Sequence, residues 1–238
     1  MTLSASHRLT ITLLTIIMIV IAGASTAHAI PMSYKLKKYN ELVHRAIAGG
    51  EETPHFYMQL RRYYSDIDDF DPDGSEIVEE MNSLAPLVKP QSQEPDDLII
   101  FENFKRIILT HLGNITVAEN AMYLAKKYPN ILNHARMKNV FYGLYNSLTI
   151  SGNGSTKRTA YDLFTLSEEA MLLEKLGMRS DFRGQEQEGL RMYAVHQVTN
   201  MKTGGPRTIY MNISAYGQKL IDQQEEEAKK SEPISIGR

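Results

Sequence analysis

The chain has 238 residues, a formal net charge of −2 at pH 7 and no cysteine. Without cysteine it can form no disulfide, no zinc–thiolate site and no thiolate nucleophile. Its near-neutral balance of charge also lacks the excess of Lys and Arg that binds nucleic acid or an anionic membrane surface. We therefore expect no nucleic-acid partner.

Residues 1–29 are predicted to be a secretory signal peptide. His7 and Arg8 form a weakly basic start, an almost wholly apolar run follows from Leu9 to Ala22, and Ala27-His28-Ala29 resembles a cleavage site. The apolar run is shorter than the roughly 20 residues that span a bilayer as a helix. The alternative is an uncleaved N-terminal anchor. We expect an exported protein, periplasmic or secreted, with no stable membrane span after cleavage.

Residues 30–150 are predicted to be a helical region that resembles tetratricopeptide (TPR) hairpins. Apolar residues recur there at three- and four-residue spacing, and glycines, prolines and polar turns separate the runs. No period of roughly 34 residues is sustained, so we expect irregular hairpins rather than a regular repeat array. The expected helices span residues 33–49, 54–65, 75–84, 98–112, 117–128 and 137–148.

The acidic segment at residues 66–74, DIDDFDPDG, and the residues after it match the EF-hand pattern. Carboxylates at alternate loop positions can face one centre, and a glutamate at the last position can bind calcium through both oxygens. The candidate ligands are Asp69, Asp71, Asp73, Ser75 and Glu80. The competing interpretation is a solvated acidic turn before the next helix, because Pro72 stiffens the loop and no second hand is present to pair with it.

From Ser151 onward the apolar pattern changes, and residues 151–217 are predicted to be a small α+β region. Residues 159–164 have the β-branched and aromatic content of a short strand, and residues 190–198 and 207–213 alternate as the two strands of a β-hairpin. The whole fold is therefore predicted to be α+β and mostly α, with a small antiparallel sheet and one packed helix.

The helix of this second region is predicted to begin at a capping box formed by Thr165 and Glu168 and to end at Gly177. The charged residues 218–238 have little apolar content beyond Leu220 and Ile221 and are expected to be a frayed helix or a flexible tail. The expected buried face of the helix consists of Leu166, Ala170, Leu173 and Leu176.

The loop SGNGST, which begins at Ser151, is either a glycine joint between helix and strand or an anion-binding site, in which backbone N–H groups surround a phosphate or other anion with Lys157 and Arg158 behind them. It lacks the Gly-Lys-Ser/Thr end of a Walker loop and does not match the nucleophile elbow. A hydrolase-like enzyme is an alternative function, with Ser151 or Ser155 as nucleophile, His196 as base and Asp162 as the orienting acid. The candidate binding residues are Ser151, Gly152, Asn153, Gly154, Ser155 and Tyr161.

Three segments in this order resemble a bacterial family. They are the run from Ser151 to Met178, the sequence RGQEQEG that begins at Arg183, and the run from Met192 to Ala215. Together they are similar to the domain-of-unknown-function family forty-nine-nineteen, most closely over residues 131–215. The resemblance implies an exported protein with TPR-like helices followed by a small α+β part, and it implies no activity.

The chain departs from this family pattern at Asn153, where Asp is usual, and at Met211, where Phe is usual. It also lacks the His and Asp that the family often carries on the strand at Tyr193–Val195. The positions that carry the resemblance are Ser151, Gly152, Gly154, Thr159, Ala160, Tyr161, Glu169, Leu172, Leu176, Gly177, Lys202, Thr203, Gly204, Tyr210, Asn212 and Ile213.

The leading functional hypothesis is a non-catalytic protein- or peptide-interaction module of the cell envelope, whose concave helical face contacts a protein or peptide partner. The calcium-binding protein and the hydrolase-like enzyme remain as alternatives, and no residue is assigned a catalytic role. No cofactor is expected apart from calcium in the acidic loop.

Overall fold

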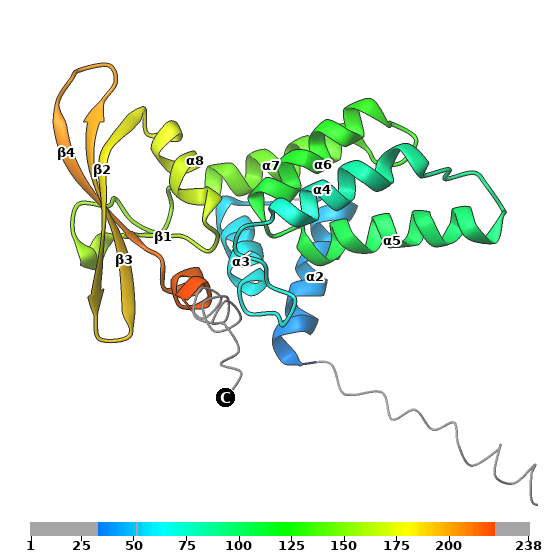
Figure 1. Ribbon diagram of the computed structural model, residues 1–238, viewed down its shortest axis with the longest axis horizontal. Helices are drawn as coiled ribbons and strands as arrows, with labels where there is room; N and C mark the ends of the chain where they lie inside the picture. Colours follow the sequence, from blue (N-terminus) through cyan, green and yellow to red (C-terminus); the bar gives the residue numbers. More distant parts are fainter. Residues whose placement is uncertain (1–32, 51, 222–238) are drawn as a thin grey trace, which may run out of the picture. The chain divides into compact units, whose positions relative to one another are not determined.

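In the computed structural model, the helices of the first half form where the apolar periodicity predicts them (Figure 1). The side chains of Thr53, Asn114 and Asn133 cap three of these helices by accepting hydrogen bonds from backbone N–H groups in their first turns. The elements are α2 (Tyr34–Ala48), α3 (Pro54–Tyr64), α4 (Ser75–Leu84), η1 (Ala85–Leu87), α5 (Pro95–His111), α6 (Ile115–Lys127) and α7 (His134–Ser147). Helix α6 packs against α7, α7 against α3, and α3 against α2, as helical hairpins do.

The structure describes residues 33–50 and 52–221. The described residues from Tyr34 onward belong to one compact unit. The predicted signal peptide lies outside the described residues. Of the predicted tail, only residues 218–221 are described, and they continue a helix that begins at residue 214. No helix within the described ranges is long and apolar enough to cross a membrane.

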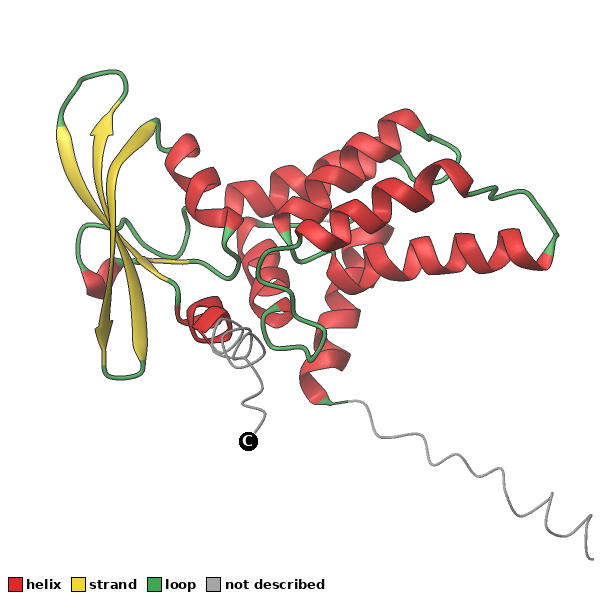
Figure 2. Ribbon diagram, viewed as in Figure 1, coloured by secondary structure: helices red, strands yellow, loops and turns green. Residues whose placement is uncertain are grey.

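From Ser151 onward, the described residues form a four-stranded sheet and two α-helices, of which the second begins at residue 214. The elements before residue 214 are η2 (Lys157–Thr159), β1 (Tyr161–Asp162), α8 (Ser167–Lys175), β2 (Met178–Glu188), β3 (Arg191–Asn200) and β4 (Pro206–Asn212). The strand order is β1-β4-β3-β2. Helices α2–α7 precede all four strands in the chain and lie together away from the sheet (Figure 2), and the predicted class, α+β and mostly α, is confirmed.

The sheet differs from the prediction in two respects. It is mixed rather than wholly antiparallel, because β1 pairs in parallel with the last strand, β4. It also contains an unpredicted strand, β2, which pairs with β3 along its length. Strand β2 is an edge strand with nearly every residue exposed, so its sequence has no apolar alternation that could reveal it.

Helix α8 buries only part of the face that the sequence predicts, since Leu173 is buried and Leu176 half-buried but Leu166 and Ala170 are exposed. The capping box between Thr165 and Glu168 does not form, because Glu168 Oε2 accepts hydrogen bonds from Phe164 N at 2.7 Å and from Arg61 Nη2 at 2.6 Å. Buried carboxylates are stable only with buried hydrogen-bond donors, so this helix requires polar partners in the interior. The buried residues of α8 are Glu168, Glu169, Leu172 and Leu173.

A buried ion pair joins the helical region to the second half of the chain. The side chains of Arg61 in α3 and Glu168 in α8 are both 0% exposed. Nε of Arg61 donates to Oε1 of Glu168 at 2.7 Å, and Nη2 donates to Oε2 at 2.6 Å. Arg61 also donates to Ser147 Oγ at 3.0 Å and to the Asp162 carbonyl at 3.1 Å. Helices α3, α7 and α8 and strand β1 therefore meet at one side chain.

Removing one partner of this pair should destabilise the fold strongly. We expect Arg61→Ala to lower the free energy of unfolding by about 3–5 kcal/mol, because Glu168 would remain buried without its counter-charge. The double variant R61M/E168M should lose less than the sum of the two single variants. Urea denaturation at pH 7 measures these differences.

The matched control is Arg62→Ala, which removes the exposed neighbour in α3 and should cost under about 0.5 kcal/mol. Additive losses in R61M and E168M, with no coupling between them, would contradict the ion pair.

Candidate functional site

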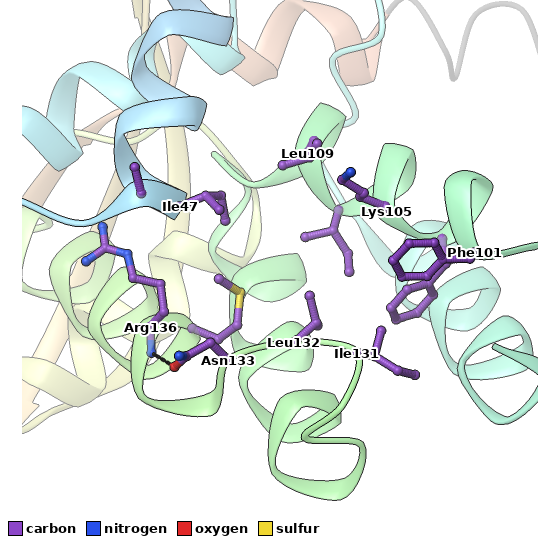
Figure 3. Close-up of a pocket in the computed structure, with 12 residues that line it drawn as sticks. Ile47, Phe101, Lys105, Leu109, Ile131, Leu132, Asn133 and Arg136 are labelled. Carbon is purple, nitrogen blue, oxygen red and sulfur yellow. Dashed lines mark hydrogen bonds between the residues drawn. The ribbon is translucent and has the colours of Figure 1, made fainter. Parts of the chain in front are cut away.

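An open apolar hollow lies in the helical region, between the end of α2, helix α5 and the start of α7 (Figure 3). Its volume is about 330 Å³. None of the described residues that line it carries a carboxylate, hydroxyl or imidazole group. The side chains that make most of its apolar surface include Ile47, Phe101, Leu109, Ile131, Leu132 and Met137.

The local sequence explains why apolar side chains remain uncovered here. In α5, Phe104 and Ile108 are buried in the core, each 1% exposed, whereas Phe101 is only half-buried and faces the hollow. Ile131 and Leu132 lie in the turn between α6 and α7, and their backbone N–H groups donate to the carbonyl of Tyr128. Adjacent apolar residues in a turn are the sequence signal that could have indicated this hollow, since turns are usually polar.

Two cations at the edge of the hollow differ in their partners. The guanidinium of Arg136 donates to the Ala46 carbonyl and forms an ion pair with Glu52. Lys105 is exposed, and its ammonium group has no hydrogen bond or ion pair with any other residue that the structure describes. Lys105 is therefore available to pair with a negative group on a bound molecule.

The hollow continues along α5 into a second, more polar one of about 500 Å³. Both are lined by Lys105 and Leu109, so they are neighbours on the same side of α5. The second is lined by Asn40 and His44 of α2 and by Arg106 of α5, among others. We call the two hollows together the α2–α5 groove. It is apolar at one end and polar at the other.

The carboxylates of the acidic loop make local hydrogen bonds. Asp71 Oδ1 accepts from Asp73 N at 2.9 Å, and Asp73 accepts from the Ser75 hydroxyl. Asp69 and Glu80 line a hollow that also includes Asp71 and that shares Arg106 and Thr110 with the second hollow of the α2–α5 groove. Among residues 33–50 and 52–221, no group of three or more His, Asp or Glu side chains is placed to hold a metal ion. Calcium binding by this loop stays a prediction.

The SGNGST loop is closed by its own backbone. The N–H groups of Asn153 and Gly154 both donate to the Thr159 carbonyl, at 3.0 and 2.8 Å, so they do not face an external anion. Gly154 has a φ of 66°, a conformation that favours glycine. Its carbonyl accepts from Tyr210 N at 2.9 Å, which joins the loop to β4. The contacts match the glycine joint that the sequence offers as one interpretation.

The candidate binding residues of this loop do not share one surface. Ser151 lines a polar cleft beside α3, whereas Gly154 and Tyr161 are buried. The exposed Asn153 and Ser155 both accept hydrogen bonds from the guanidinium of Arg207, through the Asn153 carbonyl and the Ser155 hydroxyl. Gly152 is half-buried, and a Cβ there would lie 2.4 Å from the Thr159 and Ala160 carbonyl oxygens.

His196 is 4% exposed and has two side-chain partners that the sequence does not indicate. Its Nε2 lies 2.9 Å from Glu169 Oε2, and its Nδ1 lies 2.9 Å from the Ser180 hydroxyl. No motif points to these partners, because Ser180 lies in the unpredicted strand β2 and Glu169 in the unpredicted buried face of α8.

The predicted arrangement of Ser151, His196 and Asp162 is not formed. The Ser151 hydroxyl accepts a hydrogen bond from Asp162 N at 2.8 Å. Asp162 pairs with Asn212, which faces Tyr193 of β3. His196 is three residues farther along β3 than Tyr193, and an odd separation in a strand places two side chains on opposite faces of the sheet.

Glu169 is the acceptor of a buried polar network. Arg183 donates to its two oxygens, at 2.8 Å each, and the Tyr216 hydroxyl donates to Oε1. Burial by itself raises the pKa of the Glu169 carboxyl, but the hydrogen bonds from Arg183, His196 and Tyr216 outweigh it and lower the pKa to about 2. Because Glu169 is ionised, its carboxylate accepts the hydrogen bond from His196 Nε2.

No family model matches the chain, and no curated protein or solved structure is significantly similar to it. The resemblance to family forty-nine-nineteen therefore stays a prediction. The geometry of the α2–α5 groove and of the polar network is the basis for inferring a function.

The Glu169 network should make the fold sensitive to acid. The folded-state pKa of about 2 lies below the ordinary glutamate pKa of 4.5, so the stability that Glu169 contributes is complete above the unfolded-state pKa and is lost as pH falls toward 2. This contribution is about 3 kcal/mol near neutral pH. Urea unfolding between pH 7 and pH 3 should show wild type losing more stability than Glu169→Gln, which is less stable at pH 7.

Glu186→Gln is the matched control, since Glu186 is an exposed carboxylate in β2. Its stability should follow the wild-type pH dependence. Parallel curves for wild type and Glu169→Gln would show that the network does not hold this carboxyl in its ionised form.

Proposed function

We propose that this chain is a non-catalytic peptide-binding module and that the α2–α5 groove binds an extended segment of a partner protein. The observation that carries the proposal is an open apolar hollow with Lys105 at its edge. The ammonium group of Lys105 has no partner among the described residues. The segment that fits it has one large apolar side chain and a carboxylate a few residues away.

The chemistry of the apolar end favours binding over catalysis, whereas His44, Glu102 and Thr110 line the second hollow of the groove. The apolar end has no described carboxylate, hydroxyl or imidazole that could act as nucleophile or base. Burying one Leu, Ile or Phe side chain of the partner contributes about 1.5–3 kcal/mol. An exposed pair between Lys105 and a carboxylate adds under about 1 kcal/mol.

The compartment of the partner follows from the predicted signal peptide. If residues 1–29 direct export, the bound segment belongs to a protein of the cell envelope. The proposed contact surface does not include every exposed apolar residue of these helices. Tyr142 of α7 and Ile99 of α5 are exposed but lie outside the lining of the groove.

A second candidate function, a hydrolase-like enzyme, is favoured by the chain of hydrogen bonds from Ser180 through His196 to Glu169. Ser180 is exposed at the sheet edge, while His196 and Glu169 are buried, so a nucleophile, a base and an orienting acid are arranged in order. In this hypothesis Ser180 replaces the predicted Ser151, and Glu169 replaces Asp162.

Selection from a library of random peptides displayed on phage tests the binding function. We expect the selected peptides to share a large apolar residue with an Asp or Glu close to it. A synthetic consensus peptide should bind wild type saturably, as measured by fluorescence anisotropy. Leu132→Asp and Lys105→Glu should each weaken this binding, the first by about tenfold or more.

Two matched controls place the same changes outside the groove. Ile99→Asp introduces a charge at an apolar residue of α5 that is 59% exposed, and Lys138→Glu reverses an exposed charge of α7. Both should bind the peptide as wild type does. Equal weakening by Ile99→Asp and Leu132→Asp, or a consensus without an apolar residue, would reject the groove as the binding site.

Labelling with diisopropyl fluorophosphate tests the enzyme hypothesis. An activated Ser180 oxygen would bond to phosphorus as the P–F bond breaks, with fluoride leaving and the hydroxyl proton passing to His196 Nδ1. Peptide mass spectrometry would then find the adduct on Ser180 and lose it in Ser180→Ala and His196→Asn. The exposed Ser155, which has no histidine partner among the described residues, is the internal control. The preferred non-catalytic function predicts no adduct on Ser180.

A further inference from the structure

A polar cleft of about 480 Å³ lies where α3 meets η2 and the sheet. It shares no lining residue with the α2–α5 groove. Side chains from α3, η2, β1, β3 and β4 line it, so segments far apart in the sequence contribute to one surface. Its chemistry is polar and rich in guanidinium groups, unlike the apolar hollow of the groove.

The cations of the cleft outnumber its acids. Arg62, Lys157, Arg158 and Arg191 line it, against Asp66 and Asp162, and this excess of positive charge occurs in a chain with a formal net charge of −2. Each acid already has a partner, since Asp66 pairs with Lys35 at 2.9 Å and Asp162 accepts from Asn212 at 2.8 Å.

The four cations are not equally available. Lys157 pairs with Glu186 at 2.8 Å, and a hydrogen bond joins the Arg191 and Tyr193 side chains. Arg62 and Arg158 are exposed and pair with no carboxylate in the part of the chain that the structure describes. Two free guanidinium groups from separate elements therefore line the same cleft, and planar guanidinium forks match phosphate and carboxylate oxygens.

Part of the remaining lining is an ordered layer of polar side chains, beside the apolar Met58, Ala160 and Phe164. Ser151 accepts from Asp162 N at 2.8 Å, Asn212 Nδ2 donates to Asp162 Oδ1, and the Ser214 hydroxyl donates to Asn212 Oδ1 at 2.6 Å. These side chains are held by one another, so they would lose little freedom on binding a ligand. Their remaining donor and acceptor positions suit the hydroxyl groups of a small polar molecule.

We propose that this cleft is a binding site for a small polyhydroxylated molecule that carries a phosphate or carboxylate group. Arg62 and Arg158 bind the anionic oxygens. The layer of Ser151, Asp162 and Asn212 binds the neutral hydroxyls. The buried Tyr193, which is 3% exposed, supplies part of the cleft wall. This site is independent of the peptide-binding groove.

Titration of the ¹⁵N-labelled protein with glucose 6-phosphate, with glucuronate and with sodium chloride at matched ionic strength tests the proposal. We expect at least one of the two sugar acids to shift the amide signals of Ser151, Asp162, Tyr193 and Asn212, with a Kd of about 1 mM or below. A response to glucose 6-phosphate alone assigns the anion as a phosphate, and a response to glucuronate alone assigns it as a carboxylate.

Matched variants separate the site from general charge effects. R62Q/R158Q should weaken binding by about tenfold or more, whereas Arg179→Gln, an exposed arginine of β2 outside the cleft, should leave it unchanged. Both variants remove exposed groups, and their melting temperatures confirm that they fold. Shifts equal to those caused by sodium chloride, or unaffected by R62Q/R158Q, would overturn the proposal.

Discussion

The buried ion pair between Arg61 and Glu168 is the constraint on which the rest of the structure depends. Two charges removed from water are stable only when nearly all their hydrogen-bonding positions are used, and Arg61 meets this requirement with Glu168, Ser147 and the Asp162 carbonyl. These bonds fix the rotation of α3 about its own axis. The next residue, Arg62, consequently lines the polar cleft, so an interior interaction positions a surface cation.

Helix α8 uses two neighbouring carboxylates in different directions. Glu168 binds Arg61 of the helical region, while Glu169 binds Arg183 of β2, His196 of β3 and Tyr216. A helix of nine residues has little apolar surface to hold it in place. Its position is set by charged hydrogen bonds on both sides, and the same bonds hold the sheet next to the helices.

The two candidate binding surfaces differ because different elements form them. The α2–α5 groove is apolar at one end because the turn before α7 leaves Ile131 and Leu132 only half-buried. The polar cleft forms where α3 meets the sheet and both present polar side chains. Within the SGNGST loop, Ser151 is the one described residue that lines this cleft. The guanidinium of Arg62, on a distant helix, is brought there only by the fold.

The positions of most helices and of strands β3 and β4 can be predicted from the sequence, because apolar spacing and caps such as Thr53 and Asn133 are local signals. Three features depend on the tertiary structure and cannot be predicted from local sequence. They are the polar edge strand β2, the parallel pairing of β1 with β4, and the partners of His196. Arg61 and Glu168 are 107 residues apart. The physical reason is range: periodicity and caps depend on residues a few positions away, whereas a buried charge finds its partner only when the whole chain has packed.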